Sequence, residues 1–406
     1  MHRTRTLLLL TLAACTSQDS GLTSRAYTID TLPGGITNTR STAPSEPGMW
    51  ALQHERDVHP AAGLPGELLD PEDVALADDG TLYVVEGDPA IINVYGPDGT
   101  FVRSIGSEGA GPGEFTAGFI ALRGDTLVLQ DPQQSRATVY RASTGEVLSI
   151  RPTTCCFYSP IRVDADGRTW IPMMAPPDTT GAPVRSFLTL SLAGDDADTV
   201  LVPEDPAVAN TPRWNVTGNN GQMRMSATVP MQPGAHEEVD PTGGLLIGYS
   251  ANYQLHRTTN GRDTVALLGR TYTPVPVTGA ERQALVDDRV KQQLAFGGDN
   301  GLDEILLRKA FDPSLIPDQR PAYQRLYVDG RGRTWVMQAT ADTTAVHLDL
   351  FGQDGIWLDS LALPEPGWAR QPYASVAFSK DRLAVVGEDA DGLPVVRIYR
   401  IERSSR

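Results

Sequence analysis

Residues that could carry out catalysis are few and scattered along this chain of 406 residues. Five histidines follow the N-terminal segment, and they fall in unrelated places: His54, His59, His236, His256 and His347. The sequence contains no G-x-S-x-G nucleophile elbow, no H-E-x-x-H zinc motif and no glycine-rich phosphate loop. Because no combination of residue types has a spacing typical of a catalytic centre, a binding role is favoured over an enzymatic one.

One set of polar residues could form a ligand site. Arg162, Glu238 and Tyr327 occupy the same position of a repeated segment described below, and the other three copies carry alanine there. A cation, a carboxylate and a phenol at one level of the fold could bind a polar ligand. The alternative is a self-satisfied structural network or ion pair, because buried polar groups usually pair with one another.

Three carboxylates end predicted strands near one face of the fold: Glu86, Asp131 and Glu388. Carboxylate oxygens are ligands that Ca²⁺ prefers, so a calcium site is one interpretation of these residues. Acidic strand ends are also expected by chance in a chain whose formal net charge is −16. No other cofactor is implied.

Cys155 and Cys156 are adjacent and precede a predicted inner strand. Adjacent cysteines can close a strained vicinal disulfide ring in an oxidising compartment. The alternatives are two reduced thiols, or one thiol that pairs with another molecule. The pair is a weak candidate for metal binding, because no further cysteine or histidine lies nearby at ligand spacing.

The N-terminal segment predicts export. Residues 1–5 include two arginines and a histidine, and residues 6–14 form an apolar run that is too short to span a bilayer. The run ends in Leu12-Ala13-Ala14-Cys15, which resembles the bacterial lipobox and implies cleavage before Cys15 and its lipidation. An ordinary secretory signal with a chance cysteine is the alternative. Thr16, rather than aspartate, follows the cysteine, and by resemblance to enterobacterial lipoproteins this favours the outer membrane.

Composition narrows the class of partner. The chain has 34 Lys+Arg against 50 Asp+Glu, so it offers no basic surface that could displace the counterions of a nucleic acid. Glycine (39) and proline (31) are typical of a turn-rich, folded chain. Three cysteines are too few for a disulfide framework. We therefore expect a folded envelope protein that does not bind nucleic acid.

The elements that would position these residues are repeated. Segments 163–173 and 328–338 share six of eleven residues, and looser or shortened copies lie at 76–86, 122–129, 239–248 and 378–386. Each copy is an apolar strand, a tight turn with Gly or Asp, and a second apolar strand, and a further hairpin follows it. Six such units predict an all-β fold, a six-bladed β-propeller of four-stranded antiparallel blades, in which stacked blades bury a continuous core.

The sixth unit is incomplete in a way that fits a ring. It contains a third strand at 395–400 and no fourth strand after it, whereas a strand-like segment at 50–58 precedes the first unit. We therefore predict that 51–58 pairs with the sixth blade and closes the ring. Closure would remove an open sheet edge that could otherwise pair with another chain.

Residues at the first blade boundary resemble a known repeat. Val94-Tyr-Gly-Pro-Asp-Gly-Thr-Phe-Val-Arg-Ser-Ile-Gly106, followed by Gly109-Ala-Gly-Pro-Gly-Glu-Phe115, resembles an NHL repeat. Over roughly residues 50–403 the chain is similar to the NHL-type six-bladed propeller lipoproteins of bacteria. Glu86 stands where that pattern often has aspartate, and the Asn-Arg pair that follows in the family is absent. A metal-dependent propeller hydrolase or lyase of the lactonase type is the alternative to a binding or scaffold module.

The predicted loops differ between the two faces of the ring. Short turns gather on one face, so the face with the long loops is the predicted binding surface. Two insertions extend it, at 203–236 and 270–321. The second contains a capping box, Thr278-Gly-Ala-Glu281, that predicts a helix to about Leu294, and a further helix is expected at 303–311. The insertions could be a lid or partner platform, or structural padding, and Trp214 is predicted to be an exposed ligand contact beside several methionines.

The domain plan follows from these features. We expect a signal peptide at 1–14, then the lipidated cysteine and a flexible tether at 15–48, in which 27–40 could form a loose hairpin on the domain, and a propeller at 49–406. No segment after the N-terminal run has the length of a membrane-spanning helix, so the lipid would be the only membrane attachment. We expect a monomer with a protein or glycan ligand of unknown identity.

Overall fold

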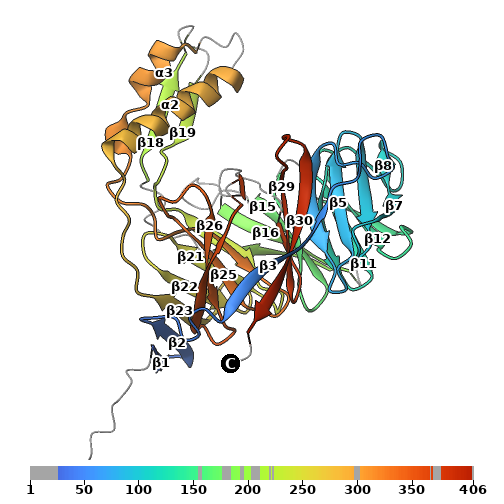
Figure 1. Cartoon of the computed structure of the whole chain (residues 1–406), viewed down its shortest axis with the longest axis horizontal. Coiled ribbons are helices and arrows are strands. Elements are labelled where there is room, and N and C mark those ends of the chain that lie inside the picture. Colours follow the sequence, from blue (N-terminus) through green and yellow to red (C-terminus); the bar gives the residue numbers. More distant parts are fainter. Residues whose placement is uncertain are drawn as a thin grey trace, which may run out of the picture.

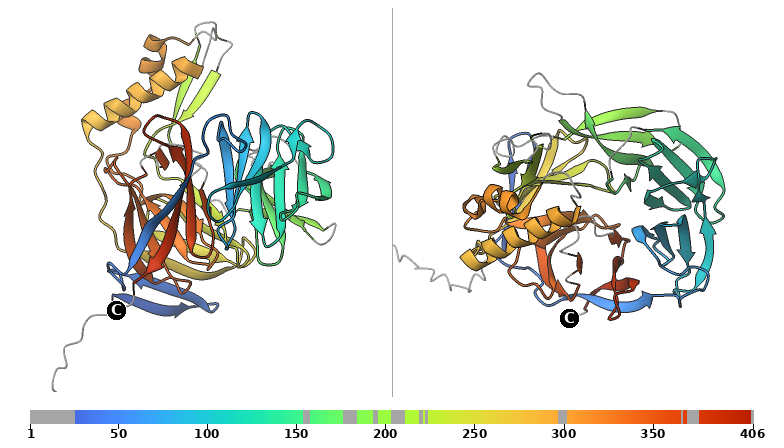
Figure 2. Two further views of the ribbon diagram at one scale, coloured as in Figure 1. Left: turned by 45° about the vertical axis from the view of Figure 1, so that its right-hand side comes forward. Right: turned by 90° about the horizontal axis from the view of Figure 1, so that it is seen from above.

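A ring of six β-sheets makes up most of the molecule (Figures 1 and 2). The computed structural model describes residues 26–153, 158–175, 184–192, 196–202, 211–218, 221, 224–296, 302–365, 367–368 and 376–404. In this part of the chain each blade of the ring contains four antiparallel strands, arranged from the inside of the ring to the outside, and two more strands extend the sheet of the fourth blade. The predicted all-β six-bladed propeller is confirmed.

The blades follow the order of the sequence. Blade one is β4 (Pro71–Leu76), β5 (Leu82–Gly87), β6 (Ala90–Tyr95) and β7 (Phe101–Ile105). Blade two is β10 (Phe119–Arg123), β11 (Thr126–Asp131), β12 (Arg136–Arg141) and β13 (Val147–Pro152). Blade three is β14 (Arg162–Val163), β15 (Arg168–Ala175), β16 (Val184–Ser191) and β17 (Ala197–Leu201).

The second half of the ring has the same plan. Blade four is β20 (Ala235–Val239), β21 (Leu245–Tyr249), β22 (Gln254–Thr258) and β23 (Thr264–Arg270). Blade five is β24 (Tyr323–Val328), β25 (Thr334–Gln338), β26 (Val346–Phe351) and β27 (Trp357–Leu363). Blade six is β28 (Val376–Phe378), β29 (Arg382–Glu388), β30 (Pro394–Arg403) and, from the start of the chain, β3 (Trp50–Val58).

The closing strand lies where the sequence predicts it. β3 is antiparallel to β30, with Trp50 opposite Arg403 and Val58 opposite Val396. Val58 and Val396 are both fully buried, in a cluster that joins blade six to blade one. Closure of the ring therefore rests on backbone pairing and on apolar burial, which is the main favourable contribution to folding.

A buried aspartate explains why the repeat is recognisable in the sequence. The carboxylate of Asp329 accepts hydrogen bonds from the backbone N–H of Arg331 (2.9 Å) and from Trp335 Nε1 (2.8 Å). Asp164 has the same role in blade three, where Trp170 Nε1 donates to it at 2.7 Å. One carboxylate thus closes the turn between the first two strands of a blade and fixes the tryptophan that follows.

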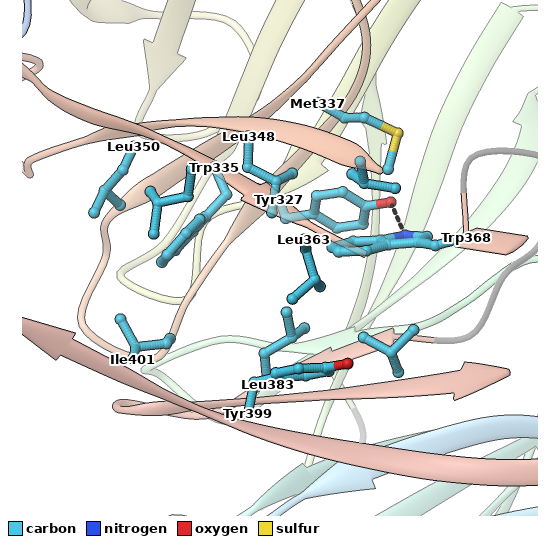
Figure 3. Packing of buried hydrophobic residues seen from close by; sticks show 13 residues of the cluster. Tyr327, Trp335, Met337, Leu348, Leu350, Leu363, Trp368, Leu383, Tyr399 and Ile401 are labelled. Carbon is cyan, nitrogen blue, oxygen red and sulfur yellow. Dashed lines mark hydrogen bonds between the residues drawn. The ribbon is translucent and has the colours of Figure 1, made fainter. Parts of the chain in front are cut away.

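Apolar side chains fill the space between neighbouring blades. In the cluster that joins blades five and six, Trp335 and Leu350 pack with Leu383 and Ile401 (Figure 3). A similar cluster joins blades one and two. Because each blade buries one face against the next, the blades form one rigid support for the residues on the inner strands.

A hairpin before the closing strand enlarges blade four. β1 (Tyr27–Leu32) and β2 (Ile36–Ser41) form this hairpin, and β2 pairs with β23 in parallel. The loose hairpin considered for this segment is therefore a regular one that extends a sheet. It lies at the end of the molecule opposite to the helices (Figure 1).

The two insertions meet in one small structure, which we call the lobe. It contains β18 (Arg213–Thr217), β19 (Arg224–Thr228), α2 (Gly279–Phe296), α3 (Glu304–Ala310) and the 3₁₀ turn η1 (Pro313–Leu315). The predicted N-cap is present, since Glu281 N–H donates to the Thr278 hydroxyl at 3.2 Å. The lobe stands on one face of the ring and covers one side of it (Figure 2). Neither helix of the described chain has the length and apolar character needed to cross a membrane.

Candidate functional site

The inner strands line a channel along the axis of the ring. The aligned position predicted from the repeat is occupied by Ala75, Ala121, Arg162, Glu238, Tyr327 and Ala377, and all six residues line one cavity of about 890 Å³. This cavity also contacts the turns between first and second strands, for example at Asp79 and Gly124. We call this end of the ring the short-turn face, and the end with the lobe the long-loop face.

An ion pair joins the inner strands of the neighbouring blades three and four at the wall of the channel. Arg162 donates from Nε to Glu238 Oε1 (2.9 Å) and from Nη2 to Oε2 (3.2 Å), and its Nη1 donates to the Ile161 carbonyl (2.9 Å). Burial raises the pKa of Glu238 more than Arg162 lowers it. Burial lowers the pKa of Arg162, but Glu238 and other nearby groups outweigh this effect and hold it above its usual value. The pair is therefore largely self-satisfied, as the structural interpretation of these residues expected.

Tyr327 is fixed by the core of blades five and six. Its hydroxyl accepts a hydrogen bond from Trp368 Nε1 at 3.0 Å (Figure 3). The ring is 7% exposed and packs against Trp368 and Phe378. Burial raises the pKa of the phenol, although Arg325 opposes this shift. Tyr327 therefore forms a rigid part of the channel wall.

A second cavity, of about 370 Å³, lies at the other end of the ion pair. Its walls include residues at or just before the starts of inner strands, such as Ser159, His236 and Gln324. Inner strands begin on the long-loop face, so this cavity opens toward the predicted binding surface. Arg162, Glu238 and Tyr327 line both cavities, and they mark the boundary between them.

Several polar residues of this cavity were not predicted from the sequence. Arg185, on β16, forms an ion pair with Glu237 of β20, and Arg325 of β24 also lines the cavity. Burial raises the pKa of Glu237, and Arg185 only partly offsets this shift. In the sequence, only the adjacent carboxylates Glu237 and Glu238 could have indicated this group of charged residues. The position of Arg185 depends on a third strand, which the alignment of inner strands does not include.

His236 is held neutral at the edge of this cavity. Burial, together with the charges of Arg185 and Arg325, lowers the pKa of the imidazole to about 4. Its Nε2 lies 3.2 Å from the Ser250 hydroxyl, and its ring packs against Tyr323. An imidazole with this pKa is uncharged at neutral pH, so His236 adds no charge to the cavity.

Trp214 is not the exposed contact that the sequence suggested. Its side chain is 1% exposed, its ring stacks on Phe311 at a centroid distance of 4.8 Å, and Nε1 donates to the Asp312 carbonyl at 3.0 Å. It belongs to the core of the lobe, together with Val286 and Leu307. The apolar residues of the two insertions bury each other, because a small lobe needs its own core.

The three carboxylates considered for calcium serve separate structural roles. Glu86 Oε2 accepts from the backbone N–H groups of Leu69 (2.9 Å) and Asp70 (2.7 Å). Asp131 accepts from backbone N–H groups of its own loop and of Thr116, and Glu388 is exposed at the end of β29. No group of three or more His, Cys, Asp or Glu residues in the described ranges could hold a metal ion. Calcium binding by these three carboxylates remains a prediction from the sequence.

Cys15, Cys155 and Cys156 lie outside the described residues. Lipidation of Cys15 and a vicinal disulfide between Cys155 and Cys156 remain predictions from the sequence.

Comparisons with known proteins identify the fold and no more. Neither a protein-family model nor a curated protein matches the chain. Among solved structures, a member of the DUF4221 family from Bacteroides vulgatus gives a TM-score of 0.50 at 10% identity, covering 88% of this chain and 99% of that one. A Bacteroides fragilis structure described as that of an exported protein gives 0.49 at 11% identity, covering 90% and 99%. A streptogramin B lyase gives 0.39 at 9% identity over 86% of this chain and 97% of that one. At 10% identity the likeness to the DUF4221 structure shows a similar fold, which by itself assigns no function.

Proposed function

We propose that this protein is a non-catalytic binding or scaffold module of the bacterial cell envelope, which holds a protein or glycan partner on its long-loop face. The observation that carries the proposal is the cavity of about 370 Å³ at that end of the channel, where charged side chains from three blades converge. A concave site with a few placed polar groups on a rigid support is typical of ligand binding. The lobe stands on the same face and adds surface beside the cavity.

The arrangement of the chain supports attachment through its N-terminal side. Hairpin β1–β2, near which the described residues begin, lies at the end of the molecule opposite to α2 and α3 (Figure 1). A lipid on Cys15 would therefore leave the lobe and the cavity facing away from the membrane. Several acyl chains on one residue bind stably, because each buried CH₂ contributes about 0.8 kcal/mol. This orientation would present the long-loop face to a partner.

The loop between blades one and two supports an NHL-type propeller. It begins with β8 (Ser107–Glu108), which pairs in parallel with β9 (Glu114–Phe115). Phe115 is fully buried, and a Cβ added at Gly106 would lie 2.8 Å from its ring. Gly106 also has a φ of +73°, so side chains other than hydrogen would be strained there. Gly106 and Phe115 of the repeat thus hold the loop after the outer strand of blade one against the start of blade two.

The alternative of a metal-dependent hydrolase or lyase has less support. The two carboxylates that line the cavity are paired with arginines, Glu238 with Arg162 and Glu237 with Arg185. His236, the histidine of the cavity wall, contacts Ser250 and is neutral. We therefore treat binding as the function that this geometry supports best.

Site-specific photo-crosslinking in the native host tests the proposal. A photoreactive amino acid is placed at Ile305 of the lobe, which is 81% exposed, and at Tyr158, which is 49% exposed and directly precedes Ser159 of the cavity wall. Matched controls carry it at Asp166 and Asn260, which are exposed in short turns. We expect the first two positions, and not the controls, to crosslink one and the same macromolecule. Crosslinks from the controls alone, or from none of the four, contradict the proposal.

A further inference from the structure

The cavity at the long-loop end of the channel differs in charge from the molecule as a whole. Three guanidinium groups line it (Arg162, Arg185 and Arg325), against two carboxylates (Glu237 and Glu238). The chain as a whole has a formal net charge of −16. Among the described residues that line the cavity, guanidinium groups therefore outnumber carboxylates, and an anion would be attracted to them.

The ion pairs leave arginine N–H groups available to a ligand. A guanidinium has five N–H donors. Among the described residues Arg185 contacts one carboxylate, that of Glu237, and it makes a long hydrogen bond of 3.5 Å to the Ala235 carbonyl. Its side chain is 36% exposed. A planar anion can therefore accept hydrogen bonds from Arg185 while the ion pair with Glu237 stays intact.

The other residues of the cavity wall are suited to a ligand that carries a ring or another apolar group. Phe187, Leu326, Tyr327, Pro172 and Val376 line the cavity beside the charged groups. A volume of about 370 Å³ lies within the range of small-molecule sites. The cavity thus combines apolar contact area with a small number of directional donors.

We propose that this cavity binds a small organic anion in which one carboxylate is joined to a ring-shaped or apolar body, and that Arg185 is its main contact. Since guanidinium groups only slightly outnumber carboxylates among the described residues of the walls, the cavity suits a carboxylate better than a phosphate monoester, which carries about −1.5 to −2 at neutral pH. This inference rests on the proposed function, because it assigns a ligand class to the same long-loop face.

Isothermal titration of the full chain carrying Cys15→Ser tests the ligand class. The probes are D-glucuronate and benzoate, which are carboxylates on a polar and an apolar ring. Their neutral counterparts are D-glucose and benzyl alcohol. We expect at least one carboxylate to bind, and its neutral counterpart to bind at least about tenfold more weakly, because an arginine contact discriminates in this range.

Variants then test the assigned contact. Arg185→Gln should weaken the binding of the carboxylate by at least about tenfold. Since this change leaves Glu237 buried without its partner, the double variant Arg185→Gln with Glu237→Gln removes the pair together and leaves the net charge of the cavity unchanged. It should lose binding as well. Arg123→Gln is the matched control, because Arg123 lines only the cavity at the short-turn face, and it should keep the affinity.

Three results would overturn the inference. One is no binding of either carboxylate at about 20 mM, a concentration that detects even millimolar affinity. Another is tighter binding of inorganic phosphate than of both carboxylates. The third is full affinity in the double variant when circular dichroism shows that it is folded. If the carboxylates fail while photo-crosslinking from Tyr158 still captures a macromolecule, this inference fails and the proposed function stands.

Discussion

Replacing Asp329 by alanine should destabilise blade five more than the same change destabilises blade three. Asp329 is fully buried and accepts from Trp335 Nε1, from two backbone N–H groups and from Arg333 Nε at 2.7 Å. A buried donor left unpaired costs about 1–3 kcal/mol, and a buried guanidinium that loses its partner costs more. Arg333 is only 8% exposed, so Asp329→Ala should lower the free energy of unfolding by about 3–6 kcal/mol.

Asp164→Ala is the matched control within the same chain. Asp164 has the same hydrogen bonds from its turn and from Trp170, but Arg168, which stands where blade five has Arg333, is exposed. Water can solvate its guanidinium, and the expected loss is about 2–4 kcal/mol. Urea denaturation followed by tryptophan fluorescence measures both values. Equal losses, or a larger loss for Asp164→Ala, would refute the role assigned to the Asp329–Arg333 pair.

Four further predictions concern closure, the lobe, pH and location. Val58→Asp should prevent soluble folding, because it buries a charge where β3 closes the ring; normal yield and circular dichroism would contradict this. Trp214→Ala should cost the lobe about 3–5 kcal/mol and speed hydrogen exchange in α2 and α3 while the blades stay protected; unchanged exchange would contradict its place in the core. Because the pKa of His236 is lowered in the folded state to about 4, the unfolded chain binds that proton first. Stability should therefore fall as the pH drops from about 6.5 to 4, and urea titrations should show that His236→Gln removes this part of the decline, up to about 3 kcal/mol. Cys15→Ser should release the protein from membranes or leave it unprocessed, and unchanged partitioning in cell fractionation would count against the lipid anchor.

Much of the fold could be predicted because its signal is local and repeated. The strand–turn–strand copies are visible since Asp164 and Asp329 each determine the residues around one turn. The spare strand at 50–58 could be matched to blade six because a ring has only one position for it. In contrast, β2 pairs with β23 although more than 200 residues separate Ile36 from Thr264, and nothing in either segment encodes that parallel contact.

The site could be predicted only in part, for a related reason. Arg162, Glu238 and Tyr327 share one position of the repeat, so symmetry alone placed them at the same level of the channel. Arg185 enters the cavity from β16, and its partner on β20 is about 50 residues away in the sequence. The burial of Trp214 could not be predicted, because a sequence shows that an aromatic residue is present and not which residues cover it. Phe311, which stacks on it, belongs to the other insertion.

Hydrogen exchange read by mass spectrometry, on the free protein and on its complex with the crosslinked partner, tests the central claim most directly. We expect the partner to slow exchange at the starts of β20 and β24 and in the lobe, and to leave exchange in the turns after β4, β10 and β24 unchanged. Protection confined to those short turns, with the lobe and the starts of the inner strands unaffected, would contradict the claim that the long-loop face is the binding surface.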